Sequence, residues 1–208
     1  MANIFPTIKV NISTKPKVVE DITLEASCSP AEDASYKALF QEFCDIFAWS
    51  YTEIPGLDPS IVEHCIDTWP DVVPIHQKKR PIHPSKAHAV KVEIKKLRKV
   101  GFIYPIAYIT WVPNHFPINK KQGTIRVYIE FRDLNLACPK DNFPIPFIDQ
   151  IIDACDSHEV FSFMDGFFSY NQIQIRKEDQ YKTAFTTPRG TFAYWVMPFS
   201  LKNVGAAF

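Results

Sequence analysis

Residues 124–131 impose the strictest local requirement on how this 208-residue chain folds. Apolar and polar side chains alternate through the stretch TIRVYIEF, with isoleucine, valine, isoleucine and phenylalanine at every second position. Successive side chains of a strand point to opposite faces, so the pattern predicts a strand with one buried face. Arg126 is predicted on the opposite, polar face.

A basic amphipathic helix is predicted before this strand. In the stretch HPSKAHAVKVEIKKLRKVG, Ala87, Val90, Ile94 and Leu97 recur at helical spacing and form one apolar stripe. Gly101 follows the last periodic residue and fits a C-terminal cap. Lysine and arginine side chains lie around the other faces.

Further segments alternate between helix and strand patterns. We expect helices from residue 35 with Ser35 as N-cap, over residues 147–156 and from residue 200. We expect strands over 101–106, 110–118 and 160–165, and a hairpin over 183–197 turning at residues 188–190. Residues 132–146 read as an extended, proline-rich connection. Residues 1–34 read as a poorly ordered tail or upstream linker, and residues 35–208 as one folded domain.

The net charge of zero conceals a strong asymmetry along the chain. Residues 1–75 carry a net charge of −8, residues 76–100 a net charge of +8, and the rest is balanced. A basic block of this kind suits a polyanion. An ordinary solvated helix face explains the same charges, and the sequence leaves both open.

Composition excludes several classes of protein. Five scattered cysteines without a Cys-x-x-Cys pair argue against a disulfide framework and a structural zinc site. No apolar run is long enough for a transmembrane span, and the first residues lack the pattern of a signal peptide. We expect a reducing compartment, cytoplasm or nucleus, and no membrane partner.

Asp165 is an unusual residue in its surroundings. It interrupts the aromatic stretch FSFMDGFFSYNQI, where a carboxylate is costly unless something pairs with it. It either caps the turn after a strand or binds a metal ion at the strand's end, and oxygen ligands suit Mg²⁺. Lys120, Lys121 and Arg126 likewise form either a solvated turn or a cradle for a triphosphate.

Five motifs in a fixed order resemble the reverse transcriptase of gypsy-type LTR retrotransposons. They are FAWSYTEIPGLDPSIVEH, KVGFIYPIAYITWVPNHFPINKKQGTIRVYIEFRDLN, KDNFPIPFIDQIID, FSFMDGFFSYNQI and KTAFTTPRGTFAYWVMPFSLKNVGAAF. The resemblance covers roughly residues 36–208. It implies an α+β fold, the fingers and first part of the palm of a right-hand polymerase, with a mainly antiparallel sheet.

The resemblance also implies a chemistry and roles for single residues. The activity is RNA-directed DNA synthesis, a nucleotidyl transfer with two Mg²⁺ ions, deoxynucleoside triphosphates and an RNA or DNA template–primer. Asp165 matches the first catalytic aspartate and metal ligand, and Gly166 a backbone carbonyl ligand. The nucleotide-binding positions match Lys120, Lys121, Arg126, Tyr170, Phe199 and Ser200. Arg132 matches a template-binding position.

The sequence departs from the family in four places. Gln122 stands where the family has aspartate, Ile129-Glu130-Phe131 where it has Val-Asp-Tyr, and Ser200 where it has glycine. The family's Tyr-x-Asp-Asp hairpin, which brings the other two catalytic carboxylates, lies beyond Phe208. We therefore expect a truncated fragment that is inactive alone. The alternative is a non-catalytic remnant that binds nucleic acid or a partner through the basic fingers; the oligomeric state is left open.

Overall fold

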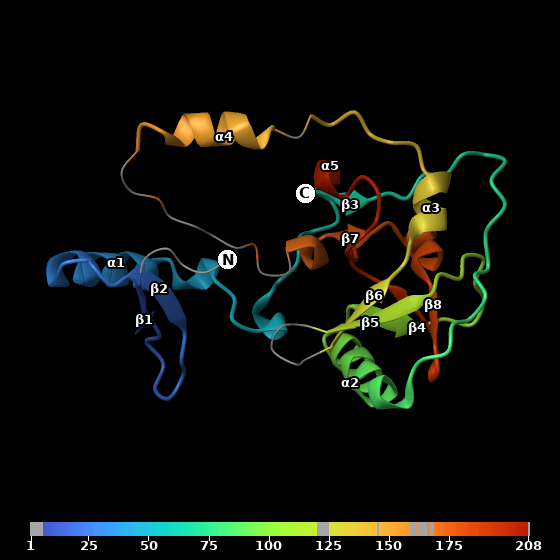
Figure 1. Cartoon of the computed structure of the whole chain (residues 1–208), viewed down its shortest axis with the longest axis horizontal. Coiled ribbons are helices and arrows are strands. Elements are labelled where there is room, and N and C mark those ends of the chain that lie inside the picture. The colour runs from blue at the N-terminus through green and yellow to red at the C-terminus, as the bar shows by residue number, and fades with distance from the viewer. Residues whose placement is uncertain are drawn as a thin grey trace. The chain divides into compact units, whose positions relative to one another are not determined.

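The chain divides into two compact units, Met1–Ile54 and Pro55–Phe208 (Figure 1). The computed structural model describes residues 6–119, 125–144, 146–158, 161, 166 and 169–207, without the side chains of Ser85 and Asn119. Within these ranges no helix has the length and apolar character needed to cross a lipid bilayer. The division into a poorly ordered tail or linker to residue 34 and a folded domain from residue 35 stays a prediction.

The first unit contains a β-hairpin that the sequence pattern did not reveal. Strands β1 (Thr7–Asn11) and β2 (Asp21–Glu25) pair in antiparallel fashion. Asn11 closes the connecting loop, because its carboxamide oxygen accepts the N–H groups of Ser13 and Glu20 at 2.9 and 3.0 Å. Regular structure therefore extends into the residues whose composition favours a tail.

Helix α1 (Pro30–Glu42) begins earlier than predicted. Ser29 is its N-cap, and a capping box links the two backbone N–H groups and side chains of Ser29 and Glu32. The prediction of Ser35 as N-cap is wrong, because this Ser-x-x-Glu box with proline at the first helical position starts the helix upstream. Two short 3-10 turns follow, η1 (Cys44–Ile46) and η2 (Tyr51–Glu53).

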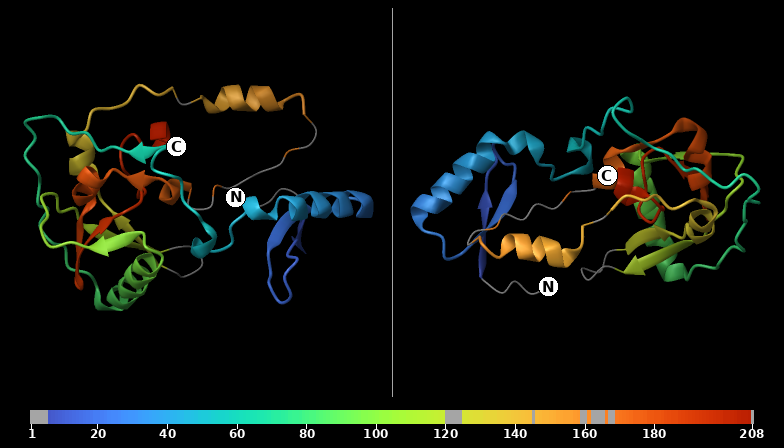
Figure 2. Two further views of the ribbon diagram at one scale, coloured as in Figure 1. Left: turned by 180° about the vertical axis from the view of Figure 1, so that it is seen from behind. Right: turned by 90° about the horizontal axis from the view of Figure 1, so that it is seen from above.

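The second unit mixes short strands with helices (Figures 1 and 2). Its elements are β3 (Glu63–His64), α2 (Pro84–Lys99), β4 (Ile103–Pro105), β5 (His115–Asn119), β6 (Ile125–Ile129), α3 (Arg132–Ala137), α4 (Ile148–Cys155), η3 (Ser169–Gln172), β7 (Gln174–Ile175), η4 (Lys177–Thr183), β8 (Phe185–Thr187), β9 (Gly190–Tyr194) and α5 (Val204–Ala207). Antiparallel pairs join β5 to β6, β4 to β9 and β8 to β9, whereas β3 and β7 pair in parallel. The architecture is α+β with mainly antiparallel pairing, as predicted.

Helix α2 packs against β6 and β4 (Figure 1). Val90 and Ile94 are 2% and 5% exposed and share one hydrophobic core with Val127 and Ile129 of β6. This packing confirms both the apolar stripe of the helix and the inward face of the strand. The energetic reason is that each element buries its single apolar side against the other.

The end of α2 confirms the predicted glycine cap. Gly101 has φ +79°, its N–H donates to the Arg98 carbonyl at 3.2 Å, and the N–H of Phe102 donates to the Leu97 carbonyl at 3.0 Å. This pair of bonds is a Schellman motif, which satisfies carbonyls left over at the helix end. It also turns the chain into β4.

The β8–β9 hairpin is confirmed with its turn at Pro188-Arg189. Thr187 lies opposite Gly190 at the end of the ladder. The Thr187 hydroxyl donates to the Gly190 carbonyl at 3.0 Å and accepts the Arg189 N–H at 3.1 Å. The turn is therefore held by one buried threonine and projects an exposed arginine.

The expected extended connection from residue 132 is wrong in its first part, because residues 132–137 form α3. Leu134 and Ala137 are 2% and 4% exposed, so burial of one side stabilises a helix too short to be seen as periodic. Helix α4 is present as predicted, but its apolar residues Ile148, Ile151 and Ile152 are exposed. The strand expected over residues 160–165 lies outside the described residues, except for Phe161.

Candidate functional site

The β5–β6 hairpin presents two chemically different faces. Val127 and Ile129 point inward, while Arg126 and Tyr128 lie on the opposite side of β6. Across the antiparallel ladder, Ile118 pairs with Arg126 and Phe116 with Tyr128, and directly paired residues share a face. We call this side the outer face; it consists of Phe116, Ile118, Arg126, Tyr128 and Glu130.

Three aromatic rings meet on the outer face. The ring of Phe199 lies 6.5 Å from that of Tyr128 and 6.3 Å from that of Tyr170, measured between centroids. These separations are typical of favourable tilted or edge-on aromatic pairs. Phe199 is nevertheless 63% exposed, so the cluster offers aromatic surface to a ligand. Two residues predicted for one site, Tyr170 and Phe199, are thus in ring contact, and Tyr128 links them to the strand of Arg126.

Backbone bonds hold the segments of Tyr170 and Phe199 together. The Met197 N–H donates to the Ile173 carbonyl at 2.8 Å, and the Asn171 carboxamide donates to the Met197 carbonyl at 3.3 Å. Met197 is fully buried beneath them. The position of Phe199 is therefore set by a core residue two positions earlier.

Ser200 adopts a conformation that glycine prefers. Its φ is +78°, a left-handed value that costs a residue with a Cβ atom about 1–2 kcal/mol. The Ser200 carbonyl accepts the Asn135 carboxamide of α3 at 2.8 Å, and the Lys202 N–H returns a bond to the Asn135 oxygen at 2.8 Å. Lys202 also donates its ammonium to the Cys138 carbonyl at 2.6 Å. These bonds fasten the segment to α3, and the left-handed φ of Ser200 is a conformation that glycine adopts without strain.

Arg80 contacts the outer face, and the sequence analysis did not identify it. Its guanidinium carbon lies 4.8 Å from the centre of the Phe116 ring, within the range of a cation–π contact. The Lys78-Lys79-Arg80 run was part of the basic block, and Phe116 fell within a predicted strand. No sequence signal joined them, because 36 positions separate the two residues.

A buried ionic cluster lies elsewhere in the second unit. Asp179 is 2% exposed; its carboxylate accepts the Lys182 ammonium at 2.7 Å, the Arg176 guanidinium at 2.8 Å and the Ile66 N–H at 3.0 Å. Burial opposes ionisation, but the bonds from Lys182 and Ile66 outweigh it, and the pKa of Asp179 is lowered. With all these bonds made within the chain, we read the cluster as structural.

Two buried histidines are disfavoured as cations. Burial is the main cause that lowers the pKa of His64, against the opposing effect of Asp179 and Asp67. Burial also lowers the pKa of His115, opposed by a hydrogen bond with the Thr186 backbone. His115 pairs with Ile129 on the inward side of the β5–β6 ladder, so it does not lie on the outer face.

The sequence is similar to transposon polyproteins of fission yeast. The Tf2-3 and Tf2-7 polyproteins of Schizosaccharomyces pombe (strain 972) are each 30% identical to it over 170 residues, which cover 82% of this chain. No protein-family model matches the sequence. The chain spans 13% of the length of each of these relatives.

Solved structures give a matching fold. The prototype foamy virus protease–reverse transcriptase superposes with a TM-score of 0.72 at 22% identity, over 88% of this chain and 24% of that one. A foamy viral protease–reverse transcriptase in complex with double-stranded DNA gives a TM-score of 0.66 at 17% identity, over 88% of this chain and 31% of that one. The predicted resemblance to the reverse transcriptase of an LTR retrotransposon is confirmed. The predicted polymerase-like α+β fold is confirmed with it.

The other residues to which the resemblance assigns a role do not join the aromatic cluster in the described part of the chain. Arg132 is 73% exposed in its side chain and pairs with Glu130, so its charge is balanced within the chain. The Gly166 carbonyl accepts the Ser169 N–H at 3.1 Å. Asp165, Lys120 and Lys121 lie outside the described residues. The roles of all these residues stay predictions.

Metal binding stays a prediction as well. Among the residues that the structure describes, no three His, Cys, Asp or Glu side chains gather in a way that could hold a metal ion. Asp165, to which the resemblance assigns this role, lies outside them.

Proposed function

We propose that this chain supplies the nucleotide- and template-contacting surface of a gypsy-type reverse transcriptase, and that the complete polymerase performs RNA-directed DNA synthesis. The observation that carries the proposal is the ring cluster of Tyr128, Phe199 and Tyr170 on the side of β6 that also carries Arg126. Two residues assigned to one nucleotide site by resemblance alone are in contact in the fold, 29 positions apart in the chain.

Each residue has a distinct task in this proposal. Arg126, exposed on β6, neutralises triphosphate oxygens together with Lys120 and Lys121, which precede β6 in the sequence. Tyr170 closes the space beneath the sugar and disfavours a 2′-hydroxyl. Phe199 packs beside the incoming base, because its exposed ring is held in place by its two tyrosine neighbours.

Oxygen donors of Asp165 and Gly166 suit magnesium. A carboxylate, a backbone carbonyl and substrate phosphates are the shell in which Mg²⁺ is usually bound. When bound, the metal ions activate the primer 3′-hydroxyl and stabilise the leaving pyrophosphate. Asp165 and the Gly166 carbonyl would hold the metal, and Arg126 would neutralise the phosphates.

The polynucleotide partner is an RNA or DNA template–primer. Support comes from Arg80, which stacks its guanidinium on Phe116 at the same face. An arginine stacked on an aromatic ring suits both phosphates and bases. A similar solved structure, the foamy viral protease–reverse transcriptase, is a complex with double-stranded DNA.

A polypeptide of these 208 residues alone should not extend a primer. It contains Asp165 but no Tyr-x-Asp-Asp sequence, so it brings one of the three carboxylates that the family uses. Phosphoryl transfer depends almost entirely on positioning and charge neutralisation, and a site with one carboxylate cannot hold both metals.

Primer extension tests the proposal. We compare the 208-residue polypeptide with one extended through the family's Tyr-x-Asp-Asp segment and the rest of the polymerase, each as wild type and as Asp165→Asn. Only the extended wild type should incorporate nucleotides with Mg²⁺, and Asp165→Asn should lower its rate by ~10³-fold or more. Equal activity of the extended Asp165→Asn variant would refute the catalytic assignment. An inactive extended wild type that still binds template–primer would favour the non-catalytic remnant.

A further inference from the structure

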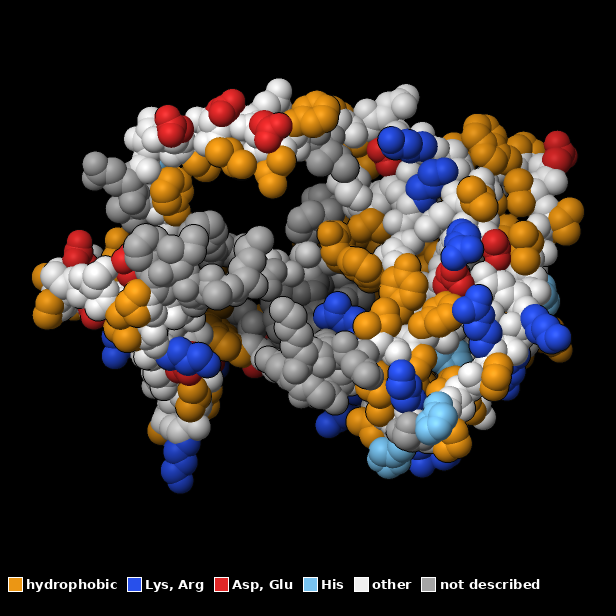
Figure 3. All heavy atoms as spheres, in the orientation of Figure 1, with side chains coloured by type: hydrophobic (Ala, Val, Ile, Leu, Met, Phe, Trp, Pro, Cys, Tyr) orange, Lys and Arg blue, Asp and Glu red, His pale blue; other side chains and the backbone are white. Residues whose placement is uncertain are grey.

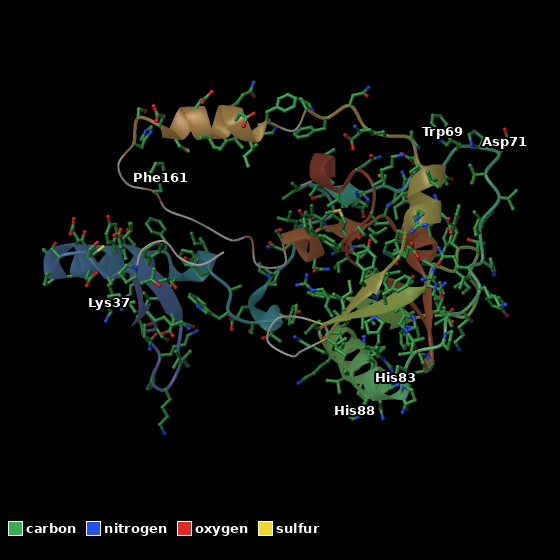
Figure 4. All side chains as sticks on the ribbon, viewed as in Figure 1. Lys37, Trp69, Asp71, His83, His88 and Phe161 are labelled. Carbon is green, nitrogen blue, oxygen red and sulfur yellow. The ribbon has the colours of Figure 1, made fainter. Side chains whose placement is uncertain are left out.

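A groove lies between helix α2 and the β8–β9 turn, away from the outer face. Its volume is about 480 Å³. The floor consists of apolar side chains from both elements: Ala87, Val90, Ile94, Pro188 and Phe192. The rim consists of basic side chains: His88, Lys91, Lys95, Arg98 and Arg189. Figure 3 shows blue Lys and Arg and pale-blue His side chains around α2, and Figure 4 places His88 on this helix with His83 just before it.

The rim cations lie in a row. Lys91, Lys95 and Arg98 follow one another at spacings of four and three residues, so they share one side of α2. Arg189 faces the groove from the β8–β9 turn. From Lys91 to Arg98 the row extends about 10 Å at the helical rise of ~1.5 Å per residue. A row of this length suits a linear polyanion better than a single ion.

These charges are not balanced within the described chain. None of Lys91, Lys95, Arg98 and Arg189 forms a side-chain ion pair with a residue that the structure describes. The cations of the buried cluster, Arg176 and Lys182, are by contrast paired with Asp179. Glu93 is the one acidic residue between positions 76 and 100. The groove therefore keeps a concentrated positive field.

The lining favours a phosphodiester chain over an acidic peptide. A bound peptide needs partners for its own N–H and C=O groups. Besides His88, the uncharged polar side chain of the lining is that of Thr187, whose hydroxyl is already used within the β8–β9 turn. A nucleic-acid strand needs cations for its phosphates and an apolar surface for its sugars or bases, and the groove offers both.

We propose that the α2 groove is a second nucleic-acid site, which binds the phosphate backbone of a single strand along Lys91, Lys95, Arg98 and Arg189. This proposal takes only the class of ligand, nucleic acid, from the proposed function. Helix α2 packs on the inward side of β6, so the groove is separate from the outer face with Arg126 and Tyr128. The groove would hold template outside the polymerase site, and the basic block would then be more than a solvated helix face.

Matched variants of one helix test this site. We measure binding of a fluorescein-labelled single-stranded oligonucleotide by anisotropy at several salt concentrations, for the 208-residue chain. The groove variant is Lys91→Gln/Lys95→Gln, and the control is Lys86→Gln/Lys99→Gln, which removes the same charge from α2 outside the groove lining. Thermal unfolding should show all proteins equally folded, since surface changes usually alter stability by less than ~0.5 kcal/mol.

The groove variant should bind the oligonucleotide about 10-fold more weakly at low salt. Its plot of log K against log salt concentration should be less steep by about 1.4, which is ~0.7 for each of two lost phosphate contacts. The control should keep the wild-type slope. Arg189→Gln, on the other wall, should lose about 0.7. Equal weakening of both double variants would mean a diffuse field and overturn the site, and so would wild-type binding by the groove variant.

Two further arms separate the ligand classes and the two proposals. Inorganic phosphate, at the same total phosphate concentration as the oligonucleotide, should displace the labelled strand poorly. Any binding of polyglutamate should be the same for the wild type and for the Lys91→Gln/Lys95→Gln variant. The opposite result with either competitor overturns the nucleic-acid assignment. If the groove variant binds like the wild type while Arg126→Gln weakens binding, the groove proposal alone fails. If the wild type binds no oligonucleotide, nucleic acid is wrong as the ligand of both the α2 groove and the outer face.

Discussion

Replacing Asp179 with asparagine should destabilise the second unit severely. The carboxylate joins η4 to Ile66, 113 positions away, and accepts hydrogen bonds from Lys182, Arg176 and the Ile66 N–H at 2.7–3.0 Å. Asparagine keeps the shape but loses the charge and turns an N–H₂ group toward one of the donors. Lys182, with 13% of its side chain exposed, is then left without its counter-ion. Removing one partner of a buried ion pair costs roughly 3–5 kcal/mol.

The lower end of that range applies here, because Arg176 keeps 38% of its side chain exposed and regains hydration when the pair is broken. A loss of about 3 kcal/mol corresponds to a fall of about 6–12 °C in the unfolding midpoint of a chain of this size. Circular dichroism during heating and urea titration measures both quantities. Glu178→Gln is the matched control, since Glu178 lies 3.8 Å from the same Arg176 but is 77% exposed. It should change stability by less than ~1 kcal/mol.

Acid unfolding gives a second measurement of the same residue. The pKa of Asp179 is lowered in the folded state, so its contribution is complete above its ordinary value of 3.8 and is lost as the pH falls further. The wild type should lose stability in this range, and Asp179→Asn should lose less. The reasoning is refuted if Asp179→Asn lies within 1 kcal/mol of the wild type at neutral pH, or if Glu178→Gln is equally costly.

Three other predictions follow from backbone geometry and burial. Ser200→Gly should raise the free energy of unfolding by about 1 kcal/mol because φ is +78°, whereas Ser200→Ala should not, and equal effects in urea titrations would contradict the backbone explanation. Gly101→Ala should lower it by about 1 kcal/mol through strain alone, since a Cβ atom there meets nothing within 4 Å; an unchanged unfolding midpoint would contradict this. Burial lowers the pKa of His64 in the folded state, so as the pH drops below 6.5 the unfolded chain binds a proton before the folded chain does, and the free energy of unfolding should fall. His64→Gln should make the free energy of unfolding depend less on pH in this range. An identical pH profile for the variant and the wild type would contradict this.

Local pattern was sufficient for elements that bury one regular face. The stripe containing Val90 and Ile94, and the alternation through Val127 and Ile129, are both borne out, because a helix or strand with one apolar side repeats its pattern along the sequence. Turn chemistry was sufficient at Gly101 and at Pro188-Arg189. The family resemblance added the polymerase fold, which no single element reveals.

Local pattern failed where an element is short or is stabilised from outside. Helix α3 is six residues long, less than two turns, so its buried Leu134 and Ala137 do not form a recognisable stripe. Helix α1 begins at Pro30 rather than at the predicted Ser35, because Ser29 and Glu32 form a complete capping box upstream. The β1–β2 hairpin alternates too weakly in polarity to be distinguished from a tail.

The sequence by itself determined which residues carry aromatic, cationic and acidic groups, and which helices and strands have one apolar side. Only the tertiary structure decided that Tyr128, Tyr170 and Phe199 meet, that Arg80 stacks on Phe116, and that Arg189 faces the cations of α2. These contacts join residues 29 to about 100 positions apart. The physical reason is that periodicity reports which side of an element is buried, whereas the neighbour on its exposed side depends on how the buried sides pack together.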